Sequence, residues 1–159
     1  MGSRSSEHTA YIAGFLDGDG SLMLQVKKRS DSSRGIRFMA TICLYQDSRY
    51  EHHLLWMKKF LGVGYISTRN DGMSELRIQG YKTVCELLSA FQPYIRFKDV
   101  QCEALMHACE LLIKTKLKDM TMNDLKKIVS YIVTIQNANY DSKKRKTKEE
   151  LYAQLGLTP

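Results

Sequence analysis

Long apolar stretches are absent from this sequence. No run of about 18 apolar residues occurs in its 159 residues, so we expect neither a transmembrane helix nor a membrane partner. Residues 1–6 also lack an apolar run and do not resemble a signal peptide. Met1-Gly2-Ser3 resembles a remnant of expression, and we expect residues 1–6 to form a tail. Hydrophobic residues still make up 43% of the chain, enough for a core.

Cysteine pairs with the spacing of metal ligands are missing as well. The four cysteines are Cys43, Cys85, Cys102 and Cys109, and none forms a C-x-x-C pair. Cys102 and Cys109 could share a helix face near His107, but no fourth ligand is evident. We therefore expect buried, reduced thiols rather than a zinc site.

Acidic residues are outnumbered, with 17 Asp and Glu against 24 Lys and Arg and a net charge of +7. This excess is compatible with a polyanionic partner, although the total by itself is weak evidence. A charge run is often only a solvated face. Two separate basic clusters, the first on a strand pattern, favour a binding role: Lys27, Lys28, Arg29, Arg34 and Arg37, then Lys143, Lys144, Arg145, Lys146 and Lys148.

Alternating apolar and polar residues predict two β-hairpins. Residues 21–29 and 36–45 alternate with period two and are joined by a polar loop. Residues 65–69 and 73–79 flank Asn70-Asp71-Gly72, a sequence typical of a tight turn.

Helical patterns fill most of the remaining chain. Asp47 or Ser48 can cap the second helix and Gly62 can end it, while Pro93 follows the third. The order is helix, hairpin, helix, hairpin, helix and a helical C-terminal part. No low-complexity linker interrupts it, so we expect one α+β domain over residues 7–155. The predicted helices are 7–18, 48–61, 81–91, 98–117, 122–137 and 148–155.

The segment from Tyr11 to Gly20 is the most informative for chemistry. Asp17 and Asp19 bracket Gly18 where the first helix ends. A helix C-terminus carries partial negative charge, so the Asp19 carboxylate needs a compensating cation, and oxygen ligands suit Mg²⁺. Ordinary turn chemistry explains the same residues equally well.

Two other interpretations of glycine-rich segments fail. An EF-hand loop starting at Asp17 would have Leu22 where glycine is required and Lys28 where glutamate is required. The segment 62–64 is too short for a dinucleotide-binding loop, and Ser67 stands where its last glycine should be.

Tyr11 to Gly20 resembles the signature of the LAGLIDADG homing endonucleases. Residues 61–65 resemble that family's entry into its second hairpin, and residues 92–98 resemble its approach to the third helix. Residues 141–147 resemble the phosphate-binding tail of single-motif, intron-encoded members from algal chloroplasts. The resemblance covers about residues 9–155. It implies an αββαββα core with C-terminal helices, in which an antiparallel β-sheet forms a DNA-binding saddle.

The resemblance also assigns catalytic roles. Asp19 matches the family's metal-binding acid, and Gly18 matches a position whose backbone carbonyl also contacts metal. Gln46 matches a residue that orders water, and Lys98 matches a lysine near the scissile phosphate. The implied cofactor is Mg²⁺, with Mn²⁺ as a substitute and Ca²⁺ supporting binding without cleavage.

One position departs from the family pattern. A basic residue often follows Gln46 by a few positions, but Tyr50 stands at the expected place and Arg49 is shifted by one. The assignment of that basic residue therefore stays open.

The resemblance further implies contacts with duplex DNA. A strand of about 8 residues spans about 27 Å, or roughly 8 base pairs, so two half-sites and a centre need roughly 20 base pairs. Phosphates would contact Lys143, Lys144 and Arg145. Base edges would contact Gln25, Lys27, Arg29, Arg37, Tyr65, Arg69, Glu75 and Arg77.

A single motif supplies one metal-binding helix, whereas cutting two strands needs two. We therefore expect a homodimer joined through the first helix, where Ala10, Ala13 and Gly14 form a stripe of small residues with Asp17 beside it. The family analogy implies a metal shared by both Asp19 carboxylates between two flanking ions, and a staggered cut of a near-palindromic site that leaves 3′ overhangs.

Two other functions stay open at this point: an RNA-binding intron maturase on the same fold, and a non-catalytic DNA-binding regulator. A location in a chloroplast or mitochondrion is favoured over an archaeal cytoplasm.

Overall fold

Two hairpins, each followed by a helix, make up the first half of the protein. The computed structural model describes residues 6–139 and 145–159. Its elements are α1 (Ser6–Asp19), β1 (Gly20–Lys28), β2 (Ile36–Asp47), η1 (Ser48–Tyr50), α2 (Glu51–Leu61), β3 (Tyr65–Thr68), β4 (Met73–Gln79), α3 (Tyr81–Phe91), η2 (Gln92–Tyr94), α4 (Asp99–Lys114), η3 (Leu117–Asp119), α5 (Met122–Ala138) and α6 (Lys148–Leu155). The α+β class and the element order expected from the sequence are confirmed.

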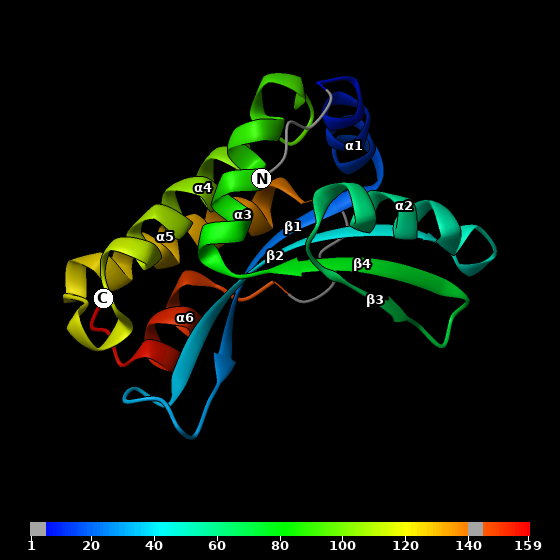
Figure 1. Ribbon diagram of the computed structural model, residues 1–159. Coiled ribbons are helices and arrows are strands. Elements are labelled where there is room, and N and C mark those ends of the chain that lie inside the picture. Colours follow the sequence, from blue (N-terminus) through cyan, green and yellow to red (C-terminus); the bar gives the residue numbers. More distant parts are fainter. Residues whose placement is uncertain (1–5, 140–144) are drawn as a thin grey trace.

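The four strands form one antiparallel sheet in the order β1-β2-β4-β3 (Figure 1). Leu44 of β2 pairs with Gly20 at the start of β1 and with Leu76 of β4, so the two hairpins meet along β2 and β4. Gly20, the first residue of β1, therefore lies at the end of the β1–β2 ladder, level with residues of β2 that also pair with β4, and directly follows the acid that ends α1.

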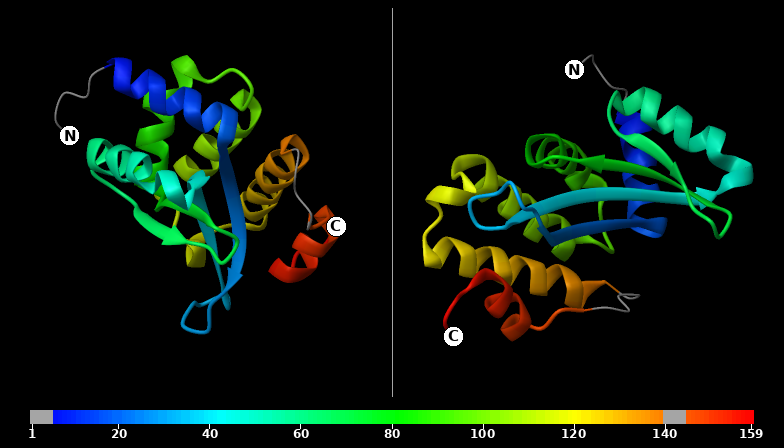
Figure 2. Two further views of the ribbon diagram at one scale, coloured as in Figure 1. Left: turned by 90° about the vertical axis from the view of Figure 1, so that its right-hand side faces the viewer. Right: turned by 90° about the horizontal axis from the view of Figure 1, so that it is seen from below.

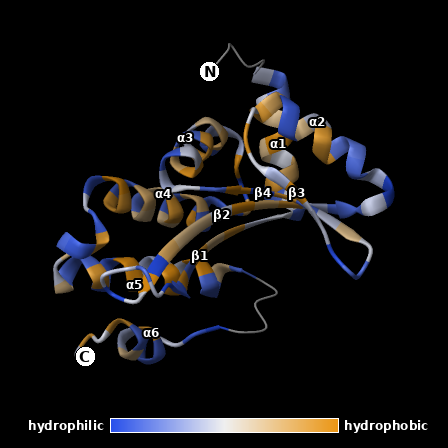
Figure 3. Ribbon diagram, turned by 60° about the horizontal axis from the view of Figure 1, so that its bottom comes forward, coloured by the Kyte–Doolittle hydropathy of each residue, from blue (hydrophilic) through white to orange (hydrophobic). Residues whose placement is uncertain are grey.

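One face of the sheet carries the core. The apolar set of the alternation, for example Leu22, Ile42 and Leu76, is fully buried. Figure 1 shows α1, α2 and α3 above the strands, and α4 and α5 pack against β1. The apolar bands of these helices and strands appear in Figure 3. Burying such side chains is worth about 1.5–3 kcal/mol each and fixes which face of the sheet is covered.

The opposite face carries the polar set and is partly open to solvent. Within the described chain, no helix lies beneath β2, β3 and β4 in Figure 1, and the right-hand view of Figure 2 shows the sheet from that side. Thr41 and Cys43 belong to this face yet are fully buried. The reason is their central position, because β1 and β4 flank β2 on both sides.

Several helix boundaries differ from the predicted ones. Helix α1 is one residue longer at each end, and α5 extends one residue further, to Ala138. The second helix begins with the short helix η1, in which the backbone N–H of Arg49 donates to the carboxylate of Asp47 at 2.9 Å, and α2 starts only at Glu51. Helix α4 starts one residue after its predicted beginning and ends at Lys114, three residues before its predicted end, because Thr115 adopts an extended conformation. The left-handed Gly62 ends α2 as expected.

The C-terminal helices brace the first hairpin. The Arg34 guanidinium, from the β1–β2 loop, donates to the carbonyl oxygens of Leu117 at 3.0 Å and Met120 at 2.8 Å. The loop at the end of the long hairpin is thereby fastened to the α4–α5 connection. No helix among the described residues is long and apolar enough to cross a membrane.

All four cysteines are free thiols; Cys43, Cys102 and Cys109 are buried as expected, whereas Cys85 is only half-buried. Burial raises the pKa of Cys43 and of Cys102 to about 11 and that of Cys109 to about 12, so these thiols stay protonated at neutral pH. No group of three or more His, Cys, Asp or Glu side chains that could hold a metal occurs within residues 6–139 and 145–159.

Candidate functional site

The two acids of the motif occupy different environments. Asp17 is buried, and its carboxylate accepts hydrogen bonds from the backbone N–H groups of Arg96 (2.9 Å), Phe97 (3.0 Å) and Lys98 (2.8 Å). Burial raises the pKa of this carboxyl, but those hydrogen bonds outweigh it and lower the pKa below its ordinary value of 3.8. Asp17 thus fastens the start of α4 to the end of α1.

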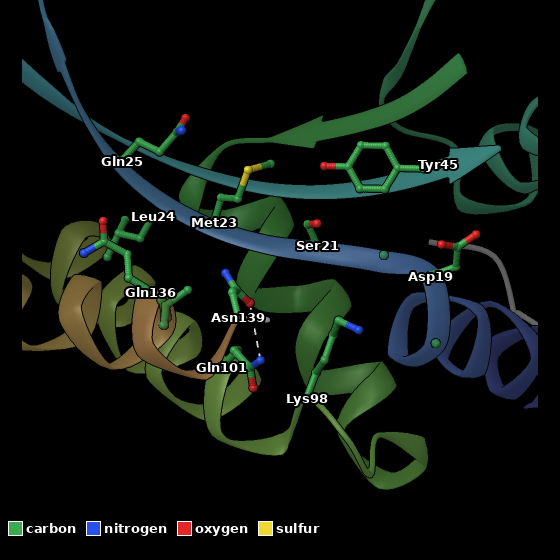
Figure 4. A pocket seen from close by; sticks show the side chains of 13 residues that line it. Asp19, Ser21, Met23, Leu24, Gln25, Tyr45, Lys98, Gln101, Gln136 and Asn139 are labelled. Carbon is green, nitrogen blue, oxygen red and sulfur yellow. Dashed lines mark hydrogen bonds between the residues drawn. The ribbon is translucent and has the colours of Figure 1, made fainter. Parts of the chain in front are cut away.

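Asp19, by contrast, is exposed at the last residue of α1 and lines a pocket of about 540 Å³ (Figure 4). Lys98 lines the same pocket, and its ammonium donates to the backbone carbonyl oxygen of Asp17 at 2.6 Å. The lysine satisfies a carbonyl at the negative end of α1 and brings a positive charge to the neighbourhood of Asp19.

The oxygen atoms at this end of the pocket suit a hard divalent cation. Asp19 contributes a carboxylate and Gly18 exposes its backbone beside it. Mg²⁺ is usually bound through one or two carboxylates and keeps several waters, so one acid per chain fits that ion without a cage of protein ligands.

Gln46, the third residue predicted to be catalytic, is not among the side chains that line this pocket. It lies two residues beyond Leu44 on β2, and its side-chain Oε1 accepts from the backbone N–H of Asp47 at 2.8 Å. The neighbouring Tyr45 lines the pocket instead. The structure thus brings Asp19 and Lys98 together in the pocket, whereas Gln46 lies near the end of β2, beyond the residues that pair with β1, and pairs with Ser74 of β4.

Arg49, the candidate for the missing basic residue, is held away from the pocket. Its guanidinium donates twice to the carboxylate of Asp47, at 3.0 and 2.9 Å, and the side chain is 78% exposed. That carboxylate's pKa falls to about 2 because of the hydrogen bonds from Arg49.

Four pocket residues come from the C-terminal half and were not predicted: Gln101, Ile135, Gln136 and Asn139. The Gln101 side-chain amide donates to the carbonyl oxygen of Ala138 at 3.0 Å and to Oδ1 of Asn139 at 3.3 Å, and Figure 4 shows the contact between the two side chains. Gln101 lies three residues after Lys98, so helical spacing could have indicated it. The position of Asn139 depends on how α5 packs and left no signal in the sequence.

The open face of the sheet gathers several of the predicted base-contacting residues. Lys27 of β1 pairs directly with Arg37 of β2, and both are exposed. Gln25 precedes them on the same face, and the exposed Tyr65 pairs with Arg77 on the other hairpin. Long polar side chains on adjacent strands of an open, twisted sheet are what base-edge contacts in a groove require.

Glu75 is the exception, and its predicted contact with a base edge is wrong for this conformation. The residue is only 4% exposed. Its carboxylate accepts from Arg77 at 2.6 Å and from Arg69 at 3.2 Å. The two guanidinium groups cover the carboxylate, so Glu75 holds the arginines in place and does not itself reach the surface.

The remaining predicted contacts lie outside the sheet. Arg29 follows β1 and pairs with Asp31 at 2.6 Å. Arg145 is exposed and donates to the carbonyl oxygen of Asn139 at 2.7 Å. Lys143 and Lys144 lie outside the described residues.

The exposed side of α1 differs from the predicted stripe. Gly14 is exposed, and a Cβ added there or at Gly18 would meet open space. Ala13 is fully buried in its own protomer, and Asp17 is bound to the start of α4, so placing these two residues at a dimer interface was wrong. Ala10 is half-buried at the edge of the exposed side.

A sequence profile described as LAGLIDADG endonuclease matches residues 12–103, more than half of the chain. The protein belongs to the LAGLIDADG endonuclease family. The family expected from the motif is thereby confirmed.

Two DNA endonucleases are similar in sequence to this LAGLIDADG protein. DNA endonuclease I-CvuI of Chlorella vulgaris is 31% identical over 107 residues, which are 67% of this chain and 66% of that protein. DNA endonuclease I-CreI of Chlamydomonas reinhardtii is 27% identical over 146 residues, which are 92% of this chain and 86% of that protein.

A solved structure shows the same fold. The crystal structure of I-CvuI in complex with its target, in the presence of 2 mM Ca, is similar with a TM-score of 0.84 and 24% identity. The similarity covers 97% of this chain and 98% of that chain. The LAGLIDADG fold expected from the sequence is therefore confirmed.

Proposed function

We propose that this LAGLIDADG protein is a site-specific homing endonuclease that acts as a homodimer on a long, near-palindromic duplex. One observation carries the proposal: the pocket that holds Asp19 and Lys98 opens beside the polar face of the sheet, where Gln25 also lines it. A duplex lying on that face would place a backbone phosphate near the acid and the lysine.

In this proposal the sheet and the basic residues beyond it bind the DNA, and the pocket carries out the hydrolysis. Gln25, Lys27, Arg37, Tyr65 and Arg77 contact base edges and set which sequence is bound. The basic residues near position 145 neutralise phosphates and strengthen binding to any duplex.

Within the pocket, the Asp19 carboxylate and the Gly18 carbonyl would hold Mg²⁺, which when bound would supply Lewis-acid stabilisation of the charge that develops on phosphate oxygens during hydrolysis. Lys98 places its ammonium beside the same phosphate and stabilises that charge from the protein. Gln46 orients a water molecule. Because each chain has one such acid, two chains are needed to cut two strands.

The test is selection of cleaved sites from a random duplex library incubated with the full chain and Mg²⁺. We expect a partly symmetric consensus of roughly 20 base pairs with 3′ overhangs at its centre. Intact DNA that is nevertheless bound would favour a non-catalytic regulator, and preference for intron RNA over duplex DNA would favour a maturase.

We also infer that residues 7–155 form one folding unit and that the protein acts in an organelle. The location rests on the resemblance of residues 141–147 to the tail of single-motif, intron-encoded members from algal chloroplasts.

A further inference from the structure

The outer half of the β1–β2 hairpin consists of two strands only. Strand β4 pairs with β2 from Thr41 to Asp47, whereas residues 36–40 of β2 pair with β1 alone in the described chain. Residues 24–28 and 36–40 are named here the outer ribbon. A two-stranded ribbon twists more than a wider sheet and is marginally stable by itself. The place of each side chain on the outer ribbon therefore depends on what holds the ribbon from outside.

Helices hold the apolar face of the outer ribbon. Val26, Ile36 and Phe38 are buried, and α4 and α5 pack against β1. The hydroxyl of Tyr81, from α3, donates to the carbonyl oxygen of Phe38 at 2.6 Å. This packing ends with the ribbon, because the loop of residues 29–35 that closes the hairpin is exposed at every position except Ser32.

Arg34 is the connection between this loop and the C-terminal half. Its Nε donates to the carbonyl oxygen of Leu117 at 3.0 Å and its Nη2 to that of Met120 at 2.8 Å. Within residues 6–139 and 145–159, no other hydrogen bond joins the loop to a segment outside the hairpin. The right-hand view of Figure 2 shows the loop beside the α4–α5 connection. Two hydrogen bonds from a charged, planar donor fix both the position and the orientation of the hairpin's tip.

The loop itself is closed, so a force on Arg34 is passed to both strands. The backbone N–H of Arg29 donates to the carbonyl oxygen of Gly35 at 2.9 Å, and that of Gly35 donates to the carbonyl oxygen of Ser32 at 3.0 Å. Gly35 has a φ of 66°, a conformation that favours glycine. The tip therefore moves as one body with the ends of β1 and β2.

Two of the proposed base contacts lie on the outer ribbon next to this tip, and this step rests on the proposed function. Lys27 and Arg37 pair directly across the two strands, and both are exposed. Lys27 lies seven residues after Gly20, so it is about 23 Å further along the strand from the Asp19 end, or roughly 7 base pairs. These two side chains would therefore meet the outer base pairs of a half-site, whereas Arg77, on β4, would meet inner ones.

We propose that Arg34 is a positioning residue for DNA specificity. By fastening the tip of the outer ribbon to the α4–α5 connection, it sets the twist at which Lys27 and Arg37 meet the outer base pairs. Arg34 acts through these two residues and does not itself contact a base, because both of its hydrogen-bonding arms are already bound to carbonyl oxygens of the protein.

The first test measures dissociation constants of the full chain in Ca²⁺ for a panel of single-base variants of its selected target. For Arg34→Ala we expect the preference at the outer positions to fall on the order of tenfold, the size of one base contact, while the preference at inner positions is kept. Lys118→Ala removes the same charge from the exposed surface of the α4–α5 connection and is the matched control. It should leave the preference at every position unchanged. An equal loss at all positions, or no loss at the outer ones, would overturn the proposal.

The second test distinguishes positioning from direct contact with DNA. Arg34→Ala is combined with Arg37→Ala, and preference is measured at the base pair that Arg37 reads. Since the residue to be positioned is then missing, Arg34→Ala should cause no further loss there. Independent, additive losses in the double variant would show that Arg34 does not act through Arg37 and would overturn its assigned role.

Hydrogen exchange of the protein without DNA separates failure of this inference from failure of the proposed function. Arg34→Ala should speed exchange in peptides that cover residues 29–35 and 115–121 and leave α1 and α3 unchanged. Unchanged exchange in both peptides would overturn the role of Arg34 alone, whatever the protein does to DNA. An unsubstituted chain that binds all duplexes equally would instead overturn the proposed base contacts, and the role of Arg34 in specificity with them.

Discussion

Asp17 and Lys98 bind one another in both directions: the Asp17 carboxylate accepts from the Lys98 backbone N–H at 2.8 Å, and the Lys98 ammonium donates to the Asp17 carbonyl oxygen at 2.6 Å. This pair fixes the end of the motif helix to the start of α4. It therefore sets the place of the pocket lysine relative to Asp19.

We expect Asp17→Asn to lower the free energy of unfolding by about 1–3 kcal/mol at pH 7, because buried N–H groups lose a charged acceptor. The folded pKa of Asp17 lies below its unfolded value, so the carboxylate's contribution is complete above the unfolded pKa and disappears as the pH falls through the folded pKa. Urea denaturation from pH 7 to pH 2 measures this. Asp119→Asn, at an exposed carboxylate, is the control.

Asp19→Asn should abolish cleavage while leaving target binding close to that of the unsubstituted chain, because the amide keeps the shape and loses the charge that holds Mg²⁺. Gel-shift and cleavage assays on one target measure the two effects separately. Ca²⁺ should support binding without cleavage by the unsubstituted protein. Mg²⁺-dependent cutting by Asp19→Asn would show that another group holds the metal.

Gly14→Leu should fold normally, since Gly14 is exposed and a Cβ added there meets no atom within 4 Å in its own protomer. The leucine would separate the two α1 helices, so we expect a monomer in light scattering and no double-strand cleavage. Circular dichroism checks the fold. A fully active monomeric protein would contradict the dimer.

Glu75→Gln should change base preference, because Arg69 and Arg77 lose the carboxylate that orients both guanidinium groups. We expect discrimination at the bases they contact to fall by about 1–3 kcal/mol, while affinity for unrelated duplex is unchanged or increased. Binding to single-base variants of the target measures this. Glu149→Gln on the exposed surface of α6 changes the net charge equally and serves as the control.

Arg37→Ala and Arg145→Ala should affect DNA binding in different ways, the first through sequence specificity and the second through affinity for any duplex. Arg37 lies on the open face of β2, so its loss should relax specificity at one symmetric pair of positions. Arg145 lies beyond the sheet, so its loss should weaken all duplexes alike and reduce the salt slope by about one unit per phosphate contact, or about two in the dimer. Titrations at several salt concentrations distinguish them. The opposite result would mean that the two regions were assigned backwards.

Much of this protein was determined by its sequence alone. Period-two alternation located both hairpins, Asn70-Asp71-Gly72 located a turn, and Gly62 located a helix end, because each depends on local backbone preference. The position of Asp19 at the end of α1 followed in the same way.

Tertiary structure decided the rest. Helix α1 carries small or apolar residues on several sides, so its sequence does not indicate which side faces the core. Only the packing shows that Gly14 faces outward and Ala13 faces the core. Glu75 alternates like a surface residue, yet two arginines bury it because strand pairing brings them to the same carboxylate. Asn139 reaches the pocket only because α5 packs against β1, a contact between residues far apart in the chain that no local pattern encodes.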